Sequence, residues 1–572
     1  RARRGLPHGV IEQRSPPAAP APRVRHAKGT IARLAALPAW LLTAVLGLAY
    51  LIVAPASPDL AAATYRSALF GEEGLTLWDN SWYGGHHLLA YSLFAPALGW
   101  LVSPRVVVAV SMTAAAALFE AILGRERMST TAGHVAAVWF AWGAAVSLLS
   151  ARVPFDLGLA VGLGALLAAL RRRRALALVL ALACSLASPV AGAFLALAFV
   201  AWALAGPERV WLAALAGGAL LPIAALTIAF PEGGTQPFVA SAFYPALLGV
   251  LAVGALFPTR WRALRIGTIL YALAFVACYV VASPVGGNID RLGALAGGPL
   301  AALAATGAPR RSWRRWALLA LALPLLYWQA NAPVADYEAA ASDPATTSGY
   351  YRPLLDELSA LGALYGQAHP ARIEVVPLAD HWEARYVGPH AMLARGWERQ
   401  LDTLRDSLFY EPARPLTAAR YRGWLDEQSV SLIALSDARP DYSADEESAL
   451  LRGSAVRGAQ PATGRPPAYL RLIWRSRDWL LFAVANPVPL AQTPATLTVA
   501  GHASFTLSAP ARAAYTVRLH FTPYWAVLDS PGACVERAPG DWTRVRVPRS
   551  GSVRVGISFS LTRVFDHGPR CA

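Results

Sequence analysis

The segment PFDLGLAVGLGALLAALRRRRALALVLALACSLAS, from Pro154 to Ser188, places four arginines between two runs of apolar residues. Each run approaches the length of about 20 residues that a helix needs to cross the hydrocarbon core of a bilayer. Short basic loops between apolar segments are typical of the cytoplasmic side of membrane proteins. The segment therefore predicts two membrane helices joined by a cytoplasmic turn at residues 171–174.

The composition of the whole chain agrees with this interpretation. The 572 residues are 55% hydrophobic and only 15% charged, and the mean hydropathy is +0.39. An ordinary soluble protein is less apolar than this. The net charge of +16 is concentrated in short arginine runs beside apolar segments, whereas a nucleic-acid-binding protein needs a folded basic face. We therefore expect a multi-pass protein whose partner is the lipid bilayer, with no nucleic acid.

Apolar segments of similar length recur through the first 331 residues. The segment SPVAG (188–192) interrupts one of them, which leaves open whether two spans or one kinked pair cross there. About eleven spans are predicted in all, and the helical membrane domain then covers residues 32–331. The predicted spans are 32–54, 105–123, 131–150, 154–170, 174–188, 190–206, 210–229, 238–257, 266–282, 291–307 and 316–331.

The arginines also orient the spans. A basic tail rich in Pro and Ala, residues 1–31, precedes the first span and is predicted to be disordered in the cytoplasm. The arginine runs at 171–174, 260–265 and 310–315 then fall inside the cell, and the C-terminus falls outside. Residues 87–102 would begin and end outside, so they predict a re-entrant or interfacial helix rather than a span.

The composition changes abruptly after the last span. Residues 332–480 mix helical periodicity with short apolar runs such as RIEVVPL, which predicts an exterior α/β domain. Residues 481–572 contain short alternating runs separated by Gly, Pro and Ser, which predicts an exterior β-sandwich. Cys534 and Cys571 both belong to this exterior region, and whether they form a disulfide is left open.

The first exterior loop, residues 55–104, is the densest polar and aromatic part of the predicted membrane domain. Asp59 follows the first span directly in SPDLAAATY, and Asp79 lies in LWDNSWYGGHH. Ionisable groups beside a bilayer are expensive and are often functional, although Asp59 also suits a helix N-cap. The acidic pair in GEEG (71–74) is flanked by glycine, as in a solvated turn.

The other candidate residues are aromatic, imidazole and guanidinium side chains on the outer side. The aromatics would stack on sugar rings or anchor the loop at the membrane interface, and the guanidinium groups would bind a phosphate. Adjacent histidines point apart on a regular element, which argues against a two-histidine metal site. The candidates for substrate binding are Trp82, Tyr83, His86, His87, Arg152, Asn288 and Arg291.

The order of these features resembles that of the type-C (GT-C) membrane glycosyltransferases. In both, a first span, an acid directly outside it and two interfacial helices precede the second span. The segments ADHWEARYV (379–387) and RGWERQLD (395–402) also resemble actinobacterial membrane proteins, some of them grouped with GT-C-like or 6-pyruvoyl-tetrahydropterin synthase-related membrane families. The resemblance covers most of the chain in architecture but few motifs.

The resemblance implies an exterior active site. GT-C enzymes use polyprenyl-phosphate-linked sugars and an acidic residue of the first exterior loop. Asp59 matches that acid by position and is the predicted base, with Asp79 as the second catalytic candidate. Asp79 and the histidine pair would line the acceptor side, and Arg291 would hold the donor phosphate. The sequence departs from common patterns because it lacks an adjacent acidic pair at Asp59 and a Pro-Pro motif between spans.

The functional expectation is therefore a cell-envelope enzyme in the cell membrane. It would move a sugar from a polyprenyl-phosphate donor to an exterior glycan or lipid acceptor. The sequence predicts no specific cofactor and leaves a divalent cation open. Two alternatives remain, a non-catalytic envelope scaffold and a transporter or flippase of lipid-linked material. A transporter would need polar groups at the centres of its spans, and these are nearly absent here.

Overall fold

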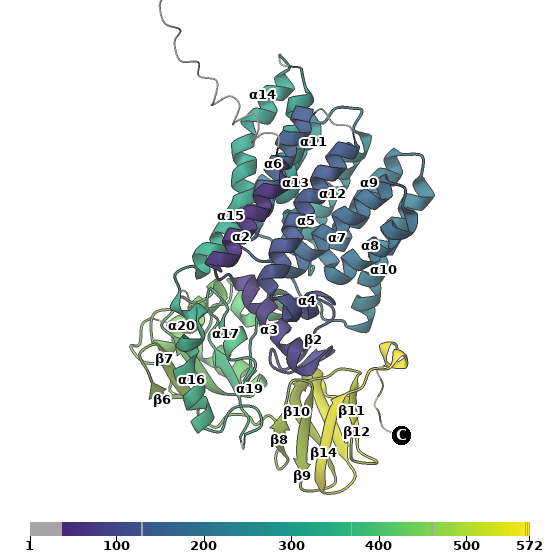
Figure 1. The fold of residues 1–572 in the computed structure, drawn as a ribbon. Coiled ribbons are helices and arrows are strands. Elements are labelled where there is room, and N and C mark those ends of the chain that lie inside the picture. The colour runs from purple at the N-terminus through teal and green to yellow at the C-terminus, as the bar shows by residue number, and fades with distance from the viewer. Residues whose placement is uncertain are drawn as a thin grey trace, which may run out of the picture. The chain divides into compact units, whose positions relative to one another are not determined.

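The computed structural model describes residues 37–126, 130–309, 311–367, 369–456, 458, 461–566, 568 and 570. The predicted tail at 1–31 and the side chain of Cys571 lie outside these residues. The chain divides into one unit that ends at Pro38 and a second that runs from Ala39 onward. Everything below concerns the second unit (Figure 1).

The helical part of the chain follows the predicted apolar segments. Its helices are α2 (Trp40–Val53), α3 (Pro58–Glu73), α4 (Ala95–Val102), α5 (Pro104–Arg125), α6 (Thr130–Ser147), α7 (Val153–Leu170), α8 (Arg174–Ala187), α9 (Pro189–Ala205), α10 (Arg209–Ala229), α11 (Ala240–Leu256), α12 (Arg262–Val280), α13 (Asp290–Gly307), α14 (Trp313–Ala320) and α15 (Ala322–Ala340).

Length and composition together identify the helices that are able to cross a membrane. Among the described residues, five helices qualify: α5, α7, α10, α12 and the continuous stretch Trp313–Ala340. The number becomes six if the bent pair of α2 and α3 forms one span. Helices α8, α9 and α11 are apolar but shorter. The predicted membrane region is therefore present, whereas the count of eleven spans stays a prediction.

Helix α3 leaves the first apolar helix at a sharp angle. The axes of α2 and α3 differ by 75°, because Ala54 ends α2 in a left-handed conformation with φ 50° and Pro58 begins α3. Arg105 of α5 donates hydrogen bonds to the carbonyl oxygens of Ala54 and Pro55 at 3.0 and 3.1 Å, which holds the bend. Helix α4 has eight residues, about 12 Å at 1.5 Å per residue, and is too short to cross.

The first large sheet after the helical part is mixed, with strand order β4-β3-β5-β7-β6. Strand β3 pairs in parallel with β4 and β5, and β7 pairs antiparallel with β5 and β6. Its strands are β3 (Arg372–Val375), β4 (Met392–Leu393), β5 (Val430–Ser436), β6 (Leu470–Arg475) and β7 (Trp479–Val484). The helices around it are α16 (Ser348–Ala360), α17 (Glu383–Tyr386), α18 (Arg399–Arg405), α19 (Ala418–Glu427) and α20 (Asp445–Leu451).

Two antiparallel sheets follow, of three and four strands, in the orders β10-β13-β12 and β11-β14-β9-β8. Buried side chains from both sheets form one apolar cluster, as the alternating sequence predicts. Cys534 on β12 is disulfide-bonded. The strands are β8 (Thr496–Ala500), β9 (Ser504–Ala509), β10 (Ala513–His520), β11 (Trp525–Val527), β12 (Cys534–Arg537), β13 (Trp542–Val547) and β14 (Gly551–Ile557).

The aromatic part of the first exterior loop lies inside the protein. Strand β1 (Trp78–Asp79) pairs antiparallel with β2 (His86–His87), and all four side chains are buried. The Trp78 ring belongs to the core of the C-terminal sheets, whereas the Trp82 ring belongs to the cluster that joins the membrane helices to the α/β part. The loop is therefore a packed junction between three parts of the chain.

Backbone hydrogen bonds fix the same junction. The amides of Leu393 and His520 donate to the carbonyl oxygens of Ser81 and Gly84 at 2.7 and 2.8 Å. Gly85 has φ 114°, and a Cβ there would lie 2.4 Å from the Trp78 ring, so only glycine fits. The α/β part and the C-terminal sheets are thus both hydrogen-bonded to the loop at residues 81–84.

Replacing Trp82 by Ala is expected to destabilise the whole protein. The side chain is fully buried, and loss of such a ring costs about 3–5 kcal/mol. The thermal midpoint of the purified protein in detergent measures the effect. Trp100→Ala is the matched control because the Trp100 side chain is 59% exposed. Equal midpoints for the two variants would contradict a structural role for the junction.

Candidate active site

The N-terminal end of α3 places a carboxylate beside two membrane helices. Asp59 lies in the first turn of α3, directly after Pro58. The Nε of Arg152, the residue before α7, lies 3.3 Å from Oδ2 of Asp59. The Asp59 and Arg152 side chains are 29% and 20% exposed. The carboxylate is therefore held at one end of these helices and remains accessible.

The same guanidinium binds a second acid that sequence reasoning missed. The Nη2 of Arg152 lies 2.9 Å from Oδ2 of Asp336, near the end of α15. The hydroxyl of Ser150 donates to that oxygen at 2.6 Å, and the carbonyl oxygen of Ser150 accepts from the Ser57 hydroxyl at 3.0 Å. Arg152 thus links two acids that are 277 residues apart in the sequence (336 minus 59). Sequence reasoning missed Asp336 because it lies beyond the last predicted span, which ends at residue 331.

Two further charged residues belong to this group. Asp156, in the first turn of α7, is fully buried, and one of its oxygens lies 3.5 Å from the Ser147 hydroxyl. Arg291, at the start of α13, interacts electrostatically with Asp59, Arg152 and Asp156. We call Asp59, Arg152, Asp156, Arg291 and Asp336 the outer charge cluster. The predicted residues Asp59, Arg152 and Arg291 are therefore brought together.

The Arg291 guanidinium is oriented by an aromatic ring. It lies over the Phe155 ring, 5.3 Å from the ring centre. In the described part of the chain, no carboxylate approaches it within ion-pairing distance. The Tyr91 side chain interacts electrostatically with Asp59, Arg66 and Arg291. Tyr91 thus extends the environment of the cluster toward the first exterior loop.

Asn288 lies one helical turn before this cluster. It belongs to the 3-10 turn η1 (Gly286–Ile289), whose Asn288 amide donates to the Val285 carbonyl at 2.8 Å. A Cβ on Gly286 would lie 1.8 Å from the carbonyl oxygen of Gln236. The backbone at Gly286 therefore lies directly against the loop that contains Gln236. A substrate-binding role for Asn288 stays a prediction.

Asp79 has a different environment from Asp59. It is fully buried, and it accepts hydrogen bonds from the Tyr65 hydroxyl at 2.7 Å and the Ser81 amide at 2.9 Å. The Nδ1 of His502 lies 3.3 Å from Oδ1 of Asp79. Burial alone would raise the pKa of Asp79, but His502, His86 and Tyr65 lower this pKa to about 2. The carboxylate therefore joins α3 to the loop before β9, and its predicted catalytic role stays untested.

The aromatic candidates pack against protein side chains. Trp82 is fully buried and stacks on Tyr65, with 4.4 Å between the ring centres. Tyr83 has φ 58°, and its buried hydroxyl accepts from the Glu398 amide at 3.0 Å. Neither ring presents a free face to solvent, so both rings support the loop in the structure described. A sugar-binding role for the two rings stays a prediction.

The two histidines differ although they are adjacent. His86 is fully buried and lies parallel to the Trp82 ring, and neither of its ring nitrogens has a hydrogen-bond partner within the described residues. Burial lowers the pKa of His86 to about 4. The Nδ1 of His87 instead lies 2.6 Å from Glu232, and its Nε2 lies 3.0 Å from the Thr522 hydroxyl. The two rings therefore have separate environments.

A polar group in the α/β part reaches back to the start of α3. The indole N–H of Trp397 donates to the carbonyl oxygen of Pro58 at 2.9 Å. The His381 ring stacks on Trp397 at 3.5 Å, and its nitrogens lie 3.4 Å from Glu383 and 3.3 Å from Asp441. Burial opposes the charge on His381, but these two carboxylates raise its pKa. This polar segment of the sequence therefore supports the residue that precedes Asp59.

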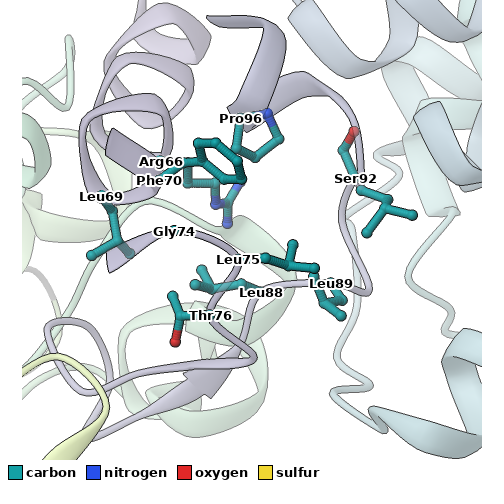
Figure 2. A pocket seen from close by; sticks show the side chains of 11 residues that line it. Arg66, Leu69, Phe70, Gly74, Leu75, Thr76, Leu88, Leu89, Ser92 and Pro96 are labelled. Carbon is teal, nitrogen blue, oxygen red and sulfur yellow. The ribbon is translucent and has the colours of Figure 1, made fainter. Parts of the chain in front are cut away.

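Among the described residues, hollows also lie away from the outer charge cluster, and two of them differ in size. Figure 2 shows the smaller, about 20 Å³ in volume, enclosed mainly by apolar side chains of α3 and residues 88–96 with Arg66 at its wall. The Nη2 of Arg66 lies 2.5 Å from Oε2 of Glu398, and the Arg66 guanidinium lies over the Tyr91 ring, 4.1 Å from the ring centre. The larger, about 610 Å³, is a groove in the exterior part lined partly by Glu427, Arg518 and Trp542.

Metal binding was left open by the sequence. Across the residues that the structure describes, no three His, Cys, Asp or Glu side chains are placed to hold a metal ion. In the outer charge cluster, Asp59 and Asp336 face the Arg152 guanidinium instead.

No known family matches the sequence, and no curated protein matches it. A cryo-EM structure of the arabinofuranosyltransferase AftD from Mycobacteria is similar with a TM-score of 0.42 and 16% identity, over 91% of this chain and 60% of that one. The chain thus spans about three fifths of the length of that enzyme.

A crystal structure of an oligosaccharyltransferase from Archaeoglobus fulgidus, tethered to an acceptor peptide, is similar with a TM-score of 0.39 and 12% identity. That match covers 69% of this chain and 68% of the other. Both of these neighbours are glycosyltransferases.

The two histidines provide a pH test of the junction. Because burial lowers the pKa of His86 from 6.5 to about 4, the unfolded chain binds a proton more readily than the folded protein. Stability is therefore lost as the pH falls from 6.5 toward 4. His86→Phe keeps a ring on Trp82. When the pH is lowered from 7 to 5, we expect the thermal midpoint of this variant to fall by less than that of the wild type.

His87→Phe is the matched control, because it removes the 2.6 Å contact between the His87 Nδ1 and the Glu232 carboxylate. We expect this variant to have a lower midpoint than wild type at both pH values. His520, whose pKa burial also lowers to about 4, keeps part of the acid sensitivity in each variant. An unchanged pH dependence in His86→Phe would contradict the environment described for His86.

Proposed function

We propose that this chain is a GT-C-type glycosyltransferase of the cell envelope, which moves a sugar from a polyprenyl-phosphate donor to an exterior glycan or lipid acceptor. The observation that carries the proposal is the outer charge cluster, where an accessible carboxylate, Asp59, lies among two arginines at the ends of membrane helices. Such charges are expensive beside a bilayer and commonly mark functional sites.

The proposal includes a topology. Eleven spans, an inside N-terminus and an outside C-terminal part would place every arginine run between spans in the cytoplasm. The outer charge cluster and both exterior parts would then lie on the outer side of the cell membrane. In this arrangement the two C-terminal antiparallel sheets would form a β-sandwich.

The proposed chemistry assigns a proton acceptor. The acceptor hydroxyl oxygen attacks the anomeric carbon, the bond from that carbon to the phosphate oxygen breaks, and the lipid phosphate leaves with the bonding electrons. The hydroxyl proton passes to the Asp59 carboxylate. Arg152 positions that carboxylate through the contact with its Oδ2, and no metal ion is part of this scheme.

Arg291 is the proposed phosphate ligand. In the described residues its guanidinium has no ion-paired carboxylate, yet the Phe155 ring fixes its position. A guanidinium in this state is suited to an incoming phosphate, which it binds through charge-assisted hydrogen bonds. Arg152 already contacts two carboxylates, so we assign it a positioning role.

The buried loop residues receive supporting roles. Asp79, Trp82, Tyr83, His86 and His87 are all buried in the junction. We propose that they fix α3, and with it Asp59, rather than contact the sugar. Asn288 would shape the turn that leads into Arg291.

The transporter alternative is less favoured by the placement of charge. A transporter needs polar groups near the middle of its helices, whereas Asp156 is in the first turn of α7 and Asp290 in the first turn of α13. Asp336 lies in the last turns of α15. A scaffold without activity is distinguished by the experiment below.

Asp59→Asn is expected to lower sugar transfer at least 100-fold, because a positioned general base contributes about 10²–10⁴ to the rate. The assay is transfer from a panel of labelled polyprenyl-phosphate sugars to envelope acceptors by the purified protein in lipid. Glu72→Gln is the matched control, since Glu72 is exposed at the other end of the same helix.

Thermal midpoints check that both proteins are folded. Transfer unaffected by Asp59→Asn would overturn the assignment of the base. No transfer by the wild type from any donor would instead favour the scaffold or the transporter.

Arg291→Gln is expected to raise the KM for the donor with a smaller effect on kcat. Loss of a hydrogen bond to a charged group costs about 1.5–3 kcal/mol, or roughly 10- to 150-fold in KM. Arg171→Gln is the control, because Arg171 is exposed and directly follows α7, at the end of that helix away from Arg152 and the outer charge cluster. A change in kcat alone would argue that Arg291 does not hold the donor in its ground state.

A further inference from the structure

The chain after the last β-strand carries exposed apolar side chains. Residues beyond β14 form a short 3-10 turn, η6 (Leu561–Val564). The side chains of Phe559, Leu561 and Phe565 are 48%, 75% and 82% exposed. We call residues 559–565 the C-terminal apolar segment. Large apolar side chains grouped on an exterior domain usually mark a surface that is covered by a partner.

This segment lies at the end of a membrane helix. Phe230, the residue directly after α10, packs against Phe559 and Tyr524, with ring centres 6.2 and 5.6 Å apart. The Tyr524 hydroxyl also donates to the carbonyl oxygen of Ala229, the last residue of α10, at 2.6 Å. Figure 1 shows the yellow C-terminal turn beside the lower end of α10.

The apolar surface of α10 extends to the same place. Helix α10 is long and apolar enough to cross a bilayer. Its exposed side chains include Leu221 at 62% and Ile228 at 53%, and Ile228 is two residues before Phe230. The Phe230 ring is itself buried, and through its contact with Phe559 it connects the exposed apolar end of α10 to the C-terminal apolar segment.

The one arginine of the segment is withdrawn into the protein. The Arg563 side chain is only 11% exposed, and its Nη1 donates to the carbonyl oxygens of Asp566 and Gly568 at 3.1 and 2.7 Å. Leu561 and Phe565, which flank it, remain exposed. A membrane interface favours this arrangement, in which the apolar side chains point outward and the charged side chain points into the protein.

We propose that the C-terminal apolar segment inserts into the bilayer surface beside α10 and anchors the C-terminal sheets to the membrane. Leu561 and Phe565 enter the boundary between headgroups and acyl chains, and Phe559 connects them to Phe230. The anchor holds the C-terminal sheets against the end of α10 and so supports the junction at His87, whose ring lies 5.6 Å from Phe230. This proposal is independent of any catalytic role.

Site-directed spin labelling tests the insertion directly. Leu561→Cys and Phe565→Cys are labelled one at a time in the full chain, in lipid nanodiscs, with Cys278→Ser as the background because Cys278 is only half-buried. Collision rates are measured with oxygen, which partitions into lipid, and with a water-soluble nickel complex. Leu472→Cys is the matched control, an exposed leucine on strand β6.

We expect the ratio of oxygen to nickel collisions to be severalfold higher at 561 and 565 than at 472. Equal ratios at the three positions would overturn the proposal, because the segment would then be in water. Low collision rates with both reagents would also overturn it and would indicate a protein contact. Spin–spin broadening in fully labelled samples, lost on dilution with unlabelled protein, would identify that contact as a second copy of the chain.

Discussion

The contact of one guanidinium with two carboxylates connects the ends of three helices. Arg152 reaches Asp59 at the start of α3 and Asp336 near the end of α15. Charges that leave bulk water need partners, because unpaired they are strongly destabilising. Asp59, Arg152 and Asp336 come from three separate segments of the chain. The two ion pairs therefore form only when α3, the start of α7 and the end of α15 are correctly placed. Asp59 remains partly exposed in this arrangement, and among the described residues no carboxylate lies within ion-pairing distance of Arg291, whose guanidinium lies over the Phe155 ring.

The α/β part and the C-terminal sheets also restrict the position of α3. Trp78 enters the core of the C-terminal sheets, while Trp82 enters the core shared by the helices and the α/β part. The Trp397 N–H then holds the Pro58 carbonyl, one residue before Asp59. A carboxylate at a helix start is otherwise free to move with its loop. Here the surrounding packing restricts α3 and so positions the proposed base.

The sequence predicted those features that depend on local pattern. Apolar runs indicated the helices, and the short apolar segment after residue 87 became α4, with eight residues. Asp59, Arg152 and Arg291 were each selected from their place beside a span, and they lie in one cluster. The change to alternating runs after 481 predicted antiparallel strands, which are present.

Features that depend on distant contacts were not predictable. Asp336 joins the cluster only because α15 returns to Arg152, and nothing near Asp336 in the sequence indicates this. The loop LWDNSWYGGHH looked like an exposed binding surface, yet its partners, such as His502 for Asp79, are more than 400 residues away. Burial of polar groups depends on such partners, so residue type alone did not distinguish Asp79 from Asp59.

The central claim is that the outer charge cluster binds a lipid phosphate beside a catalytic carboxylate. A cryo-EM structure of the chain in a nanodisc, with a non-transferable polyprenyl-phosphate sugar analogue, tests it most directly. We predict density for the phosphate within hydrogen-bonding distance of the Arg291 guanidinium and the sugar facing Asp59. Analogue bound elsewhere, for example in the exterior groove near Trp542, with the cluster unchanged, would contradict the claim.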